Sequence, residues 1–278
     1  MIREISGRHN HTVKLARKLQ DKKNRRARGV LVAEGLDLLR AAVAAGVAIQ
    51  DVLVRRDLQG ELPIELVRRA EQTDPSHPGG PHVGVCDADT LAHASLLGGS
   101  ADVIFIAPEP AWNLSDVDLA KGLAVYLDQV GDPGNVGTLV RSCVAFGAIG
   151  VICSPGTADP YSPKALRAGM GAQFIARVIT EVSPADFKAK LRRLRGGSME
   201  VPVVLVAEPC LGDDVGEVSV DAGAVLVLGA ERTGPSDDWG EGHRITIPQK
   251  GFDSLNVAMA GTVLLYELTR HAAGRGGS

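Results

Sequence analysis

Short apolar runs and amphipathic stretches alternate along most of the chain. Apolar runs of four or five residues predict buried strands, whereas apolar residues three or four positions apart predict helices. In the first part, residues 6–28 are polar and helix-prone, and residues 73–81 are rich in Pro and Gly and predict a loop. The remaining pattern predicts strands at 30–33, 52–54, 83–86 and 103–106, and helices at 36–45, 64–72 and 90–97.

The alternation resumes after a Pro-containing interruption at residues 107–110. It predicts strands at 123–127, 150–153, 176–179, 203–206, 224–228 and 244–247, and helices at 136–146, 163–171, 184–195 and 255–271. This order of strands and helices implies an α/β fold in which helices cover both faces of a parallel sheet. Because the polar stretch between the two parts predicts a linker, we expect an N-terminal domain at 1–107, a linker at 108–120 and a second domain at 121–278.

Charge is distributed unevenly, although the formal net charge is only −3. Residues 1–30, called the basic arm below, contain ten basic and two acidic side chains, so they carry +8 and the remainder carries −11. Basic residues are common on solvated helix surfaces. A cluster this one-sided nevertheless favours a polyanionic partner, and nucleic acid in particular.

Composition narrows the class of protein further. The 278 residues, 45% of them hydrophobic, can bury a full core, and no run approaches the roughly 20 apolar residues of a membrane helix. The four cysteines are far apart, which predicts free, buried thiols in a reducing cytoplasm. The seven histidines lack metal-ligand spacing and the N-terminus lacks an apolar signal core. We therefore expect a cytoplasmic protein with no metal site and no membrane segment.

The first segment with candidate chemistry is 127–141, where an apolar strand enters a glycine-rich turn and then a helix. Ligands of α/β proteins bind at the carboxyl ends of strands, where such turns lie. The glycine spacing matches neither the dinucleotide-binding fingerprint nor a phosphate-binding loop. Asn135 can cap the helix. Arg141 lies among the apolar residues of that helix and therefore requires a partner, either a ligand group or a carboxylate in a surface salt bridge.

Two later segments place polar side chains at similar corners. The apolar strand that ends at Leu228 leads into Glu231, which can orient an arginine or a ligand hydroxyl, or can be an ordinary loop acid. The last strand is followed by Ser254-Leu255-Asn256 at the start of the final helix. These residues can meet a ligand beside the free N–H groups of the helix start. Alternatively, Asp253 or Ser254 simply caps the helix.

Together and in this order, the three segments resemble the motifs of the SpoU/TrmH family of RNA ribose 2′-O-methyltransferases. The N-terminal Ser6-Gly7-Arg8-x-Asn10 with Lys14 also resembles the substrate-binding domain of the ribosomal-RNA branch, and residues 167–172 resemble the family's Arg-Ala-Ser-Met-Gly-Ala segment, with Gly169 where Ser is usual. The motif positions are Asn135 and Arg141, then Gly229-x-Glu231-x-x-Gly234, then Ile247-Pro248-x-x-Gly251 with Ser254-Leu255-Asn256-Val257.

The resemblance implies a fold, a cofactor and an assembly. The fold is an α/β parallel sheet with a C-terminal trefoil knot, preceded by a smaller N-terminal α/β domain that binds RNA. The cofactor is S-adenosyl-L-methionine, no metal takes part, and the enzyme is a homodimer with its active site at the subunit interface. The implied reaction is 2′-O-methylation of a ribose in large-subunit (23S) ribosomal RNA.

Carried over onto this chain, the resemblance implies three sets of site residues. Arg141 would stabilise the developing alkoxide of the ribose, and the remaining catalytic residues would orient it, the ribose and the cofactor: Asn135, Glu231, Ser254 and Asn256. The cofactor would be held at Leu228, Gly229, Ile247, Leu255 and Asn256. With the basic arm, RNA would be bound by Arg8, Asn10, Lys14, Lys22, Lys23, Arg25 and Arg26.

Three alternatives share part of this pattern. A transfer-RNA ribose 2′-O-methyltransferase would carry the same motifs, and a non-catalytic RNA-binding protein could retain the fold. A nicotinamide-dependent oxidoreductase would use residues 123–147 as a dinucleotide fold, with Asp159 as the ribose-binding acid. Its glycine spacing would be wrong and the basic arm would have no purpose. Cofactor binding separates each of the last two alternatives from a methyltransferase.

Overall fold

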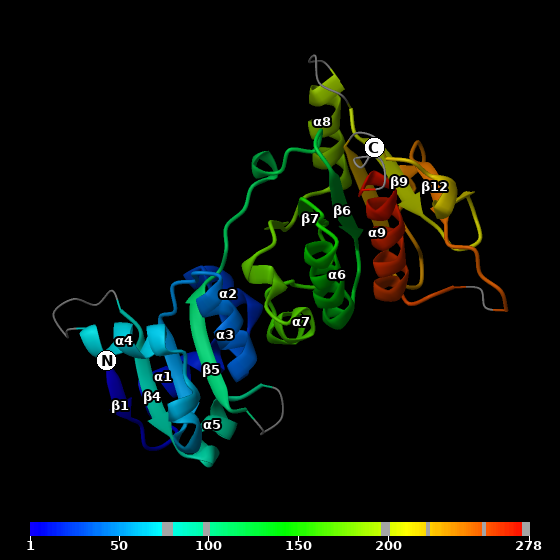
Figure 1. Ribbon diagram of the computed structural model, residues 1–278. Helices are drawn as coiled ribbons and strands as arrows, with labels where there is room; N and C mark the ends of the chain where they lie inside the picture. Colours follow the sequence, from blue (N-terminus) through cyan, green and yellow to red (C-terminus); the bar gives the residue numbers. More distant parts are fainter. Residues whose placement is uncertain (74–79, 97–100, 196–200, 221–222, 252–253, 274–278) are drawn as a thin grey trace. The chain divides into compact units, whose positions relative to one another are not determined.

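The computed structural model describes all residues except 74–79, 97–100, 196–200, 221–222, 252–253 and 274–278. The chain forms two compact units (Figure 1). The N-terminal unit comprises Met1–Pro110 together with Tyr161–Phe174, and the C-terminal unit comprises Ala111–Pro160 and Ile175–Ser278. A segment from the middle of the chain, well beyond the predicted linker, thus belongs to the N-terminal unit.

The N-terminal unit contains a mixed five-stranded sheet in the order β1-β4-β3-β5-β2. Strand β5 runs in the opposite direction to the other four strands of this sheet, so both of its pairings are antiparallel. The strands are β1 (Ile2–Glu4), β2 (Val30–Glu34), β3 (Asp51–Arg55), β4 (His82–Cys86) and β5 (Val103–Pro108). The apolar pattern does not predict β1, because this strand has three residues and a single apolar one.

The helix-prone arm folds as two helices, because Asp21 starts a new one: its carboxylate accepts a hydrogen bond of 2.7 Å from the Lys23 amide. Val13, Ala16 and Leu19 are buried and hold the first helix against the core. The helices of this part are α1 (His11–Lys18), α2 (Lys22–Arg28), α3 (Leu36–Ala44), α4 (Ile64–Gln72) and α5 (Ala88–Ala94), with a 3-10 turn at Arg56–Glu61.

The inserted segment contains α7 (Pro163–Gly169) and a 3-10 turn at Ala172–Phe174. The helix α7 packs against β2, and the Phe174 ring lies 6.2 Å from that of Phe105 in β5. The buried Gln173 donates a 2.8 Å hydrogen bond to the Ala165 carbonyl. A Cβ atom at Gly169 would lie 2.3 Å from the Gln173 side-chain oxygen. A larger residue at this position, such as the serine usual in the resembling family, would therefore require the Gln173 side chain to move.

The C-terminal unit is built on a seven-stranded sheet in the order β10-β12-β9-β11-β6-β7-β8. Every strand pair in it is parallel, which confirms the predicted α/β parallel sheet. The strands are β6 (Leu123–Asp128), β7 (Gly150–Cys153), β8 (Val178–Ile179), β9 (Val203–Ala207), β10 (Asp213–Asp214), β11 (Ala224–Gly229) and β12 (His243–Thr246).

Helices cover both faces of this sheet (Figure 1). On one face α6 (Pro133–Ala145) packs against α9 (Val257–Ala273), and a Cβ atom at Gly261 would lie 2.4 Å from Leu139, so only glycine permits this approach. On the other face lie α8 (Pro184–Arg195) and the 3-10 turn η5 (Asp237–Trp239). There the ring of Tyr126 lies 5.1 Å from Phe187 and 4.7 Å from Trp239. Two further 3-10 turns span Leu114–Asp116 and Val215–Glu217.

The cysteines agree only in part with the prediction of buried thiols. Cys86, Cys143 and Cys153 are buried, and burial raises the pKa of the Cys86 thiol to about 11. Cys210 is instead exposed, since it lies in the loop after β9 with a left-handed φ of 55°. The apolar pattern predicts which strands are buried, but it does not predict whether a single residue in a loop is buried.

Candidate active site and cofactor cavity

Three loops of the C-terminal unit meet at one edge of the sheet. The strands β6 and β11 are neighbours in register, so that Asp128 pairs with Gly229 where both end. Because the strands are parallel, the loops after β6, β11 and β12 leave the sheet at the same edge. This is the edge at which the sequence predicted ligand chemistry.

A chain of hydrogen bonds joins these loops. The Asn135 amide nitrogen donates to Glu231 Oε1 at 2.8 Å, and its amide oxygen accepts from Asn256 Nδ2 at 3.2 Å. The backbone N–H of Gly131 donates to the other Glu231 oxygen at 3.4 Å. Asn135, Glu231 and Asn256, called the polar network below, thus come from the three separate segments that the sequence singled out.

Glu231 is ionised more readily than an ordinary glutamate. Partial burial acts to raise its pKa, but hydrogen bonds from Asn135 and from backbone amides outweigh that effect and hold the pKa below its usual value. At neutral pH the group is therefore a carboxylate. It accepts hydrogen bonds and fixes the orientation of the Asn135 amide.

The caps of the two helices differ from those expected. Asp132, not Asn135, caps α6: its carboxylate accepts a 3.0 Å hydrogen bond from the backbone N–H of Asn135. Asn256 caps α9, because its side-chain oxygen accepts from the backbone N–H groups of Ala258 at 2.9 Å and Met259 at 3.3 Å. The prediction that Ser254 caps this helix is wrong, and Asp253 lies outside the described residues. Because Asp132 caps α6, the side chain of Asn135 is not needed as a cap and joins the network instead. The side chain of Asn256 does both, since it caps α9 and bonds Asn135.

Two of the five predicted catalytic residues lie outside the network. Arg141 is exposed on α6 and makes no hydrogen bond or ion pair within the part of the chain that the structure describes. Its position among apolar neighbours therefore does not bury it, so neither a ligand nor a salt bridge is required to compensate its charge. Ser254 is exposed and lines the cavity described next. The structure thus joins three of the five and leaves Arg141 and Ser254 open to solvent.

A cavity of about 520 Å³ lies beside the network, within the range typical of cofactor sites. Four of the five predicted cofactor residues line it, namely Leu228, Gly229, Ile247 and Leu255, and the fifth, Asn256, follows directly in the chain. A Cβ atom at Gly229 would lie 2.0 Å from the Pro235 backbone nitrogen, so glycine is required where these two loops touch.

The sequence reasoning missed Asp128, whose side chain is 1% exposed at the end of β6. Its Oδ2 accepts hydrogen bonds of 2.8 Å from the Ser236 amide and 3.0 Å from the Trp239 indole. Asp128 thereby holds the loop that forms one wall of the cavity. The signal was present, since a carboxylate directly after five buried apolar residues must find a partner.

Most of the predicted RNA-binding side chains are accessible, but two have roles within the fold. Asn10 caps α1, because its side-chain oxygen accepts a 2.8 Å hydrogen bond from the Thr12 amide. Arg25 is 2% exposed and donates to the carbonyls of Leu19 at 3.0 Å and Gln20 at 2.8 Å. Its guanidinium closes the turn between α1 and α2, so the structure does not present it to a phosphate. The others are exposed or half-buried: Arg8, Lys14, Lys22, Lys23 and Arg26.

Within the described residues, no group of three or more side chains is arranged to hold a metal ion. In the same part of the chain, none of the helices combines the length and apolar character that crossing a bilayer would need.

Two family models match different parts of the sequence. A model of the SpoU rRNA Methylase family matches residues 122–266, and one of an MRM3-like substrate binding domain matches residues 10–94. A 23S rRNA (uridine(2479)-2′-O)-methyltransferase of Streptomyces viridochromogenes is 33% identical over 176 residues, which span 61% of this chain and 60% of that protein. An uncharacterized tRNA/rRNA methyltransferase of Synechocystis is 27% identical over 273 residues, or 97% of this chain and 94% of that protein.

The same likeness extends to solved structures. The crystal structure of an AdoMet-bound rRNA methyltransferase from Sinorhizobium meliloti superposes with a TM-score of 0.80 at 28% identity, covering 97% of this chain and 98% of that one. The family model and the named relatives define the class of this protein as an S-adenosyl-L-methionine-dependent RNA methyltransferase. The chain belongs to the SpoU rRNA Methylase family, as its three motifs predicted.

Proposed function

We propose that the protein transfers a methyl group from S-adenosyl-L-methionine to a ribose 2′-hydroxyl of large-subunit (23S) ribosomal RNA in the cytoplasm. The polar network carries the proposal, because residues 96 and 121 positions apart in the chain meet beside a cavity of cofactor size. Family membership and the relatives named as 23S rRNA 2′-O-methyltransferases support the same reaction.

The lining of the cavity suits the cofactor. Leu228, Ile247 and Leu255 offer apolar surface to an adenine ring, and the absence of a side chain at Gly229 leaves backbone groups within reach. When bound, the cofactor supplies an electrophilic methyl group on a sulfonium. The protein's task is then to place the ribose hydroxyl in line with that methyl group, and such positioning can supply about 7–11 kcal/mol of the barrier.

The chain's own residues orient and polarise the hydroxyl, which is a weak nucleophile until it is polarised or deprotonated. We assign Arg141 to the ribose or its phosphate, where its guanidinium, which has no partner among the described residues, stabilises the developing alkoxide. It acts as a cation and not as a base, since a guanidinium carries hydrogen-bond donors and no acceptor. Asn135 and Asn256, held by Glu231, orient the ribose, and Ser254 contributes from the cavity rim.

We infer that a second copy of the chain completes the site. Met259, Val263 and Tyr266 recur at helical spacing along α9, and Leu255 lies just before the helix; the four side chains belong to residues between 40% and 61% exposed. An exposed apolar stripe of this kind marks an interaction surface. Because the stripe begins beside Asn256, a homodimer formed through it would lie against the polar network, and Arg141 would act at that interface.

We also propose that the segment between β12 and α9 passes through a trefoil knot, and that the N-terminal domain docks the RNA through the basic arm. The cavity walls support the first point, since they are formed by the loops that follow β9, β11 and β12. The exposed positions of Arg8, Lys14, Lys23 and Arg26 support the second.

The test is transfer of radiolabelled methyl from S-adenosyl-L-methionine to unmodified 23S ribosomal RNA, with transfer RNA in parallel. The label is then mapped by resistance of the methylated linkage to alkaline cleavage. We expect label at an alkali-resistant linkage in ribosomal RNA. Label in transfer RNA alone would replace the proposed substrate, and absence of label from both RNAs and from assembled ribosomal subunits would overturn the proposal.

A further inference from the structure

The helix α8 carries basic side chains that neither the polar network nor the basic arm uses. Phe187 and Leu191 are buried in the core and define the inner face of this helix. The basic residues therefore occupy its sides and outer face. Its 12 residues include a single acid, Asp186, and five basic residues: Lys188, Lys190, Arg192, Arg193 and Arg195.

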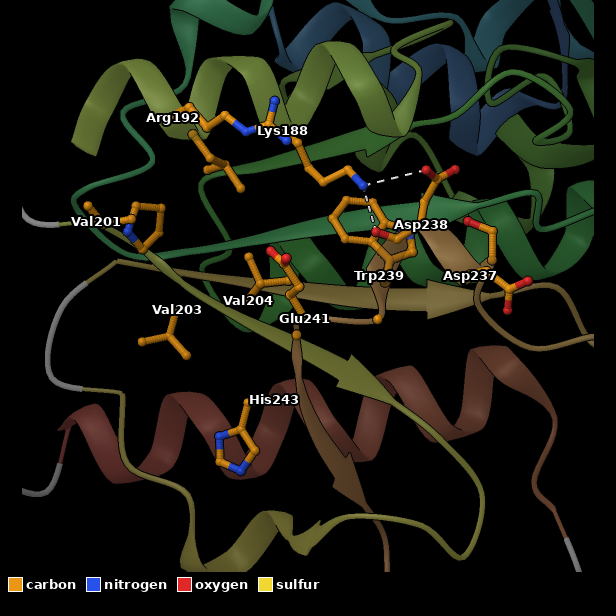
Figure 2. Close-up of a pocket in the computed structure, with 15 residues that line it drawn as sticks. Lys188, Arg192, Val201, Val203, Val204, Asp237, Asp238, Trp239, Glu241 and His243 are labelled. Carbon is orange, nitrogen blue, oxygen red and sulfur yellow. Dashed lines mark hydrogen bonds and ion pairs between the residues drawn. The ribbon is translucent and has the colours of Figure 1, made fainter. Parts of the chain in front are cut away.

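Four of these cations have side chains that the structure describes. One of them is hydrogen-bonded to another residue, and the other three make no hydrogen bond or ion pair within the described residues. The Lys188 ammonium donates a 2.6 Å hydrogen bond to the Asp238 carbonyl and lies 5.9 Å from the centre of the Trp239 ring. Figure 2 shows this contact, together with Arg192 pointing along the same side of α8 without such a partner. Within the described residues, Lys190, Arg192 and Arg193 make no hydrogen bond or ion pair. These three residues are called the α8 ridge below.

Several other exposed basic residues of the described chain are paired with acids. Lys121 lies 3.2 Å from Asp118, and Arg40 lies 3.0 Å from Glu61. On α8, Lys190 and Arg193 lie three positions apart, and like charges at this spacing repel. The one acid of the helix, Asp186, accepts a 2.6 Å hydrogen bond from Ser183 and is not paired with Lys190 in the described part of the chain. In a chain whose net charge is −3, these unpaired cations are therefore available to an external polyanion.

The neighbouring cavity shows which path such a partner would take. The space beside α8 measures about 990 Å³ and has Lys188 and Arg192 on one wall (Figure 2). The opposite wall carries Asp237, Asp238 and Glu241. These carboxylates repel a phosphate group, so a polyanion fits along the outer face of α8 and not inside the cavity.

We propose that the α8 ridge is a second RNA-contacting surface, which binds phosphodiester groups of the substrate independently of the basic arm. The inference rests on the proposed function, in which the substrate is RNA. Contacts to phosphates carry no base information, so the ridge would fix the register of a long RNA without selecting its sequence. Three cations spread over the sides and outer face of one helix suit a continuous backbone better than a single small anion.

The test compares Arg192→Gln/Arg193→Gln with Lys121→Gln/Arg40→Gln, which changes the net charge equally but removes paired cations. Binding of an unmodified 23S ribosomal RNA transcript is measured over a series of salt concentrations. For the ridge variant we expect the slope of log affinity against log salt to become shallower by about 0.7–0.9 for each phosphate group that the variant no longer neutralises. The KM for RNA should rise several-fold, while kcat at saturating RNA and cofactor affinity stay at the wild-type values. The control should match wild type throughout.

Basic residues in the last turn also interact favourably with the helix dipole. A purely structural role would lower the melting temperature of the ridge variant without changing the salt slope, and that result would overturn the inference. Equal slopes and KM values for both variants, with wild type active on RNA, would overturn it while leaving the proposed function intact. Failure of wild type to methylate any RNA would instead overturn the proposed function, and this inference with it.

Discussion

Asn135 is the residue on which the site's geometry depends, because its side chain faces two neighbours with opposite needs. It donates to Glu231 and accepts from Asn256. A primary amide can do both, since it carries a donor nitrogen and an acceptor oxygen on the same carbon. An aspartate at this position would set a second carboxylate against Glu231. The motif's asparagine is thus explained by its partners.

Replacement of Arg141 tests whether a solvent-exposed guanidinium takes part in the reaction. Arg141→Ala should lower kcat by on the order of 10²–10³-fold, the usual effect of removing one group that stabilises a developing oxyanion. Cofactor affinity, measured by calorimetry, should stay close to wild type because Arg141 does not line the cavity. Lys121→Ala serves as the control for loss of an exposed cation, and an unchanged turnover of Arg141→Ala would contradict the assignment.

Glu231 gives the network a dependence on pH. Its folded-state pKa is below the ordinary value of 4.5, so the ionised group stabilises the fold above that value, and the contribution is lost as pH falls through the folded-state pKa. The difference in unfolding free energy between wild type and Glu231→Gln should therefore be largest at neutral pH and shrink below about pH 4.5. Urea denaturation at descending pH measures it, and a difference that grows in acid would refute this account.

At the scale of elements, the start of α9 links the cap of the last helix to the polar network. Asn256 caps the helix with its side-chain oxygen and reaches Asn135 with its nitrogen. One side chain thus satisfies backbone groups of the last helix and fixes its position relative to α6. The two roles use different atoms, so they can be separated by substitution.

Asn256→Ala removes both atoms and should cost about 1 kcal/mol of unfolding free energy through the missing cap, together with most of the turnover. Asn256→Asp retains an acceptor for the cap, because aspartate caps helices as well as asparagine does. It loses the donor to Asn135, so it should keep wild-type stability while turnover falls. Denaturation curves and methyl-transfer rates are the measurements. Equal activity of Asn256→Asp and wild type would show that the link to Asn135 is dispensable.

The sequence predicts elements well where burial is uniform. All residues of β6 and β11 are buried, and continuous apolar runs placed both strands to within one residue. Helix starts are less certain, because they depend on which polar side chain caps. The helix α6 begins at Pro133, ahead of its first apolar residue, and α9 begins at Val257 after Asn256. The motifs identified four cofactor residues that line the cavity, whereas only the folded chain shows that Asn135, Glu231 and Asn256 touch.

At the scale of the whole molecule, connectivity is the feature that local patterns could not reveal. The segment Tyr161–Phe174 reads as part of the second half of the chain but packs with the first. Its partners are β2 and Phe105, more than fifty residues earlier in the sequence. Periodicity describes the face that a helix buries, but not the sheet that it is buried against.

The proposed homodimer can be tested through the stripe on α9. Wild type should sediment at roughly twice the chain mass of 29.1 kDa, and Met259→Glu/Val263→Glu should shift it to the monomer because two charges enter an apolar interface. Activity should fall in parallel if the site lies at that interface. Ile64→Glu changes an exposed apolar residue of the N-terminal unit and should leave the mass unchanged. A monomeric wild type with full activity would contradict the proposal.

The order of the N-terminal unit and the polar network along the chain also determines when a newly synthesised molecule can complete each of them. The N-terminal unit is complete once Phe174 has been synthesised, whereas the polar network waits for Asn256. At translation rates of about 5–20 residues per second, the interval between them is roughly 4–16 seconds. Throughout that interval a nascent chain emerging from a ribosome already displays its basic arm but lacks the amide that completes the site. Each molecule therefore has its proposed RNA-binding arm before it has the complete polar network proposed to modify RNA.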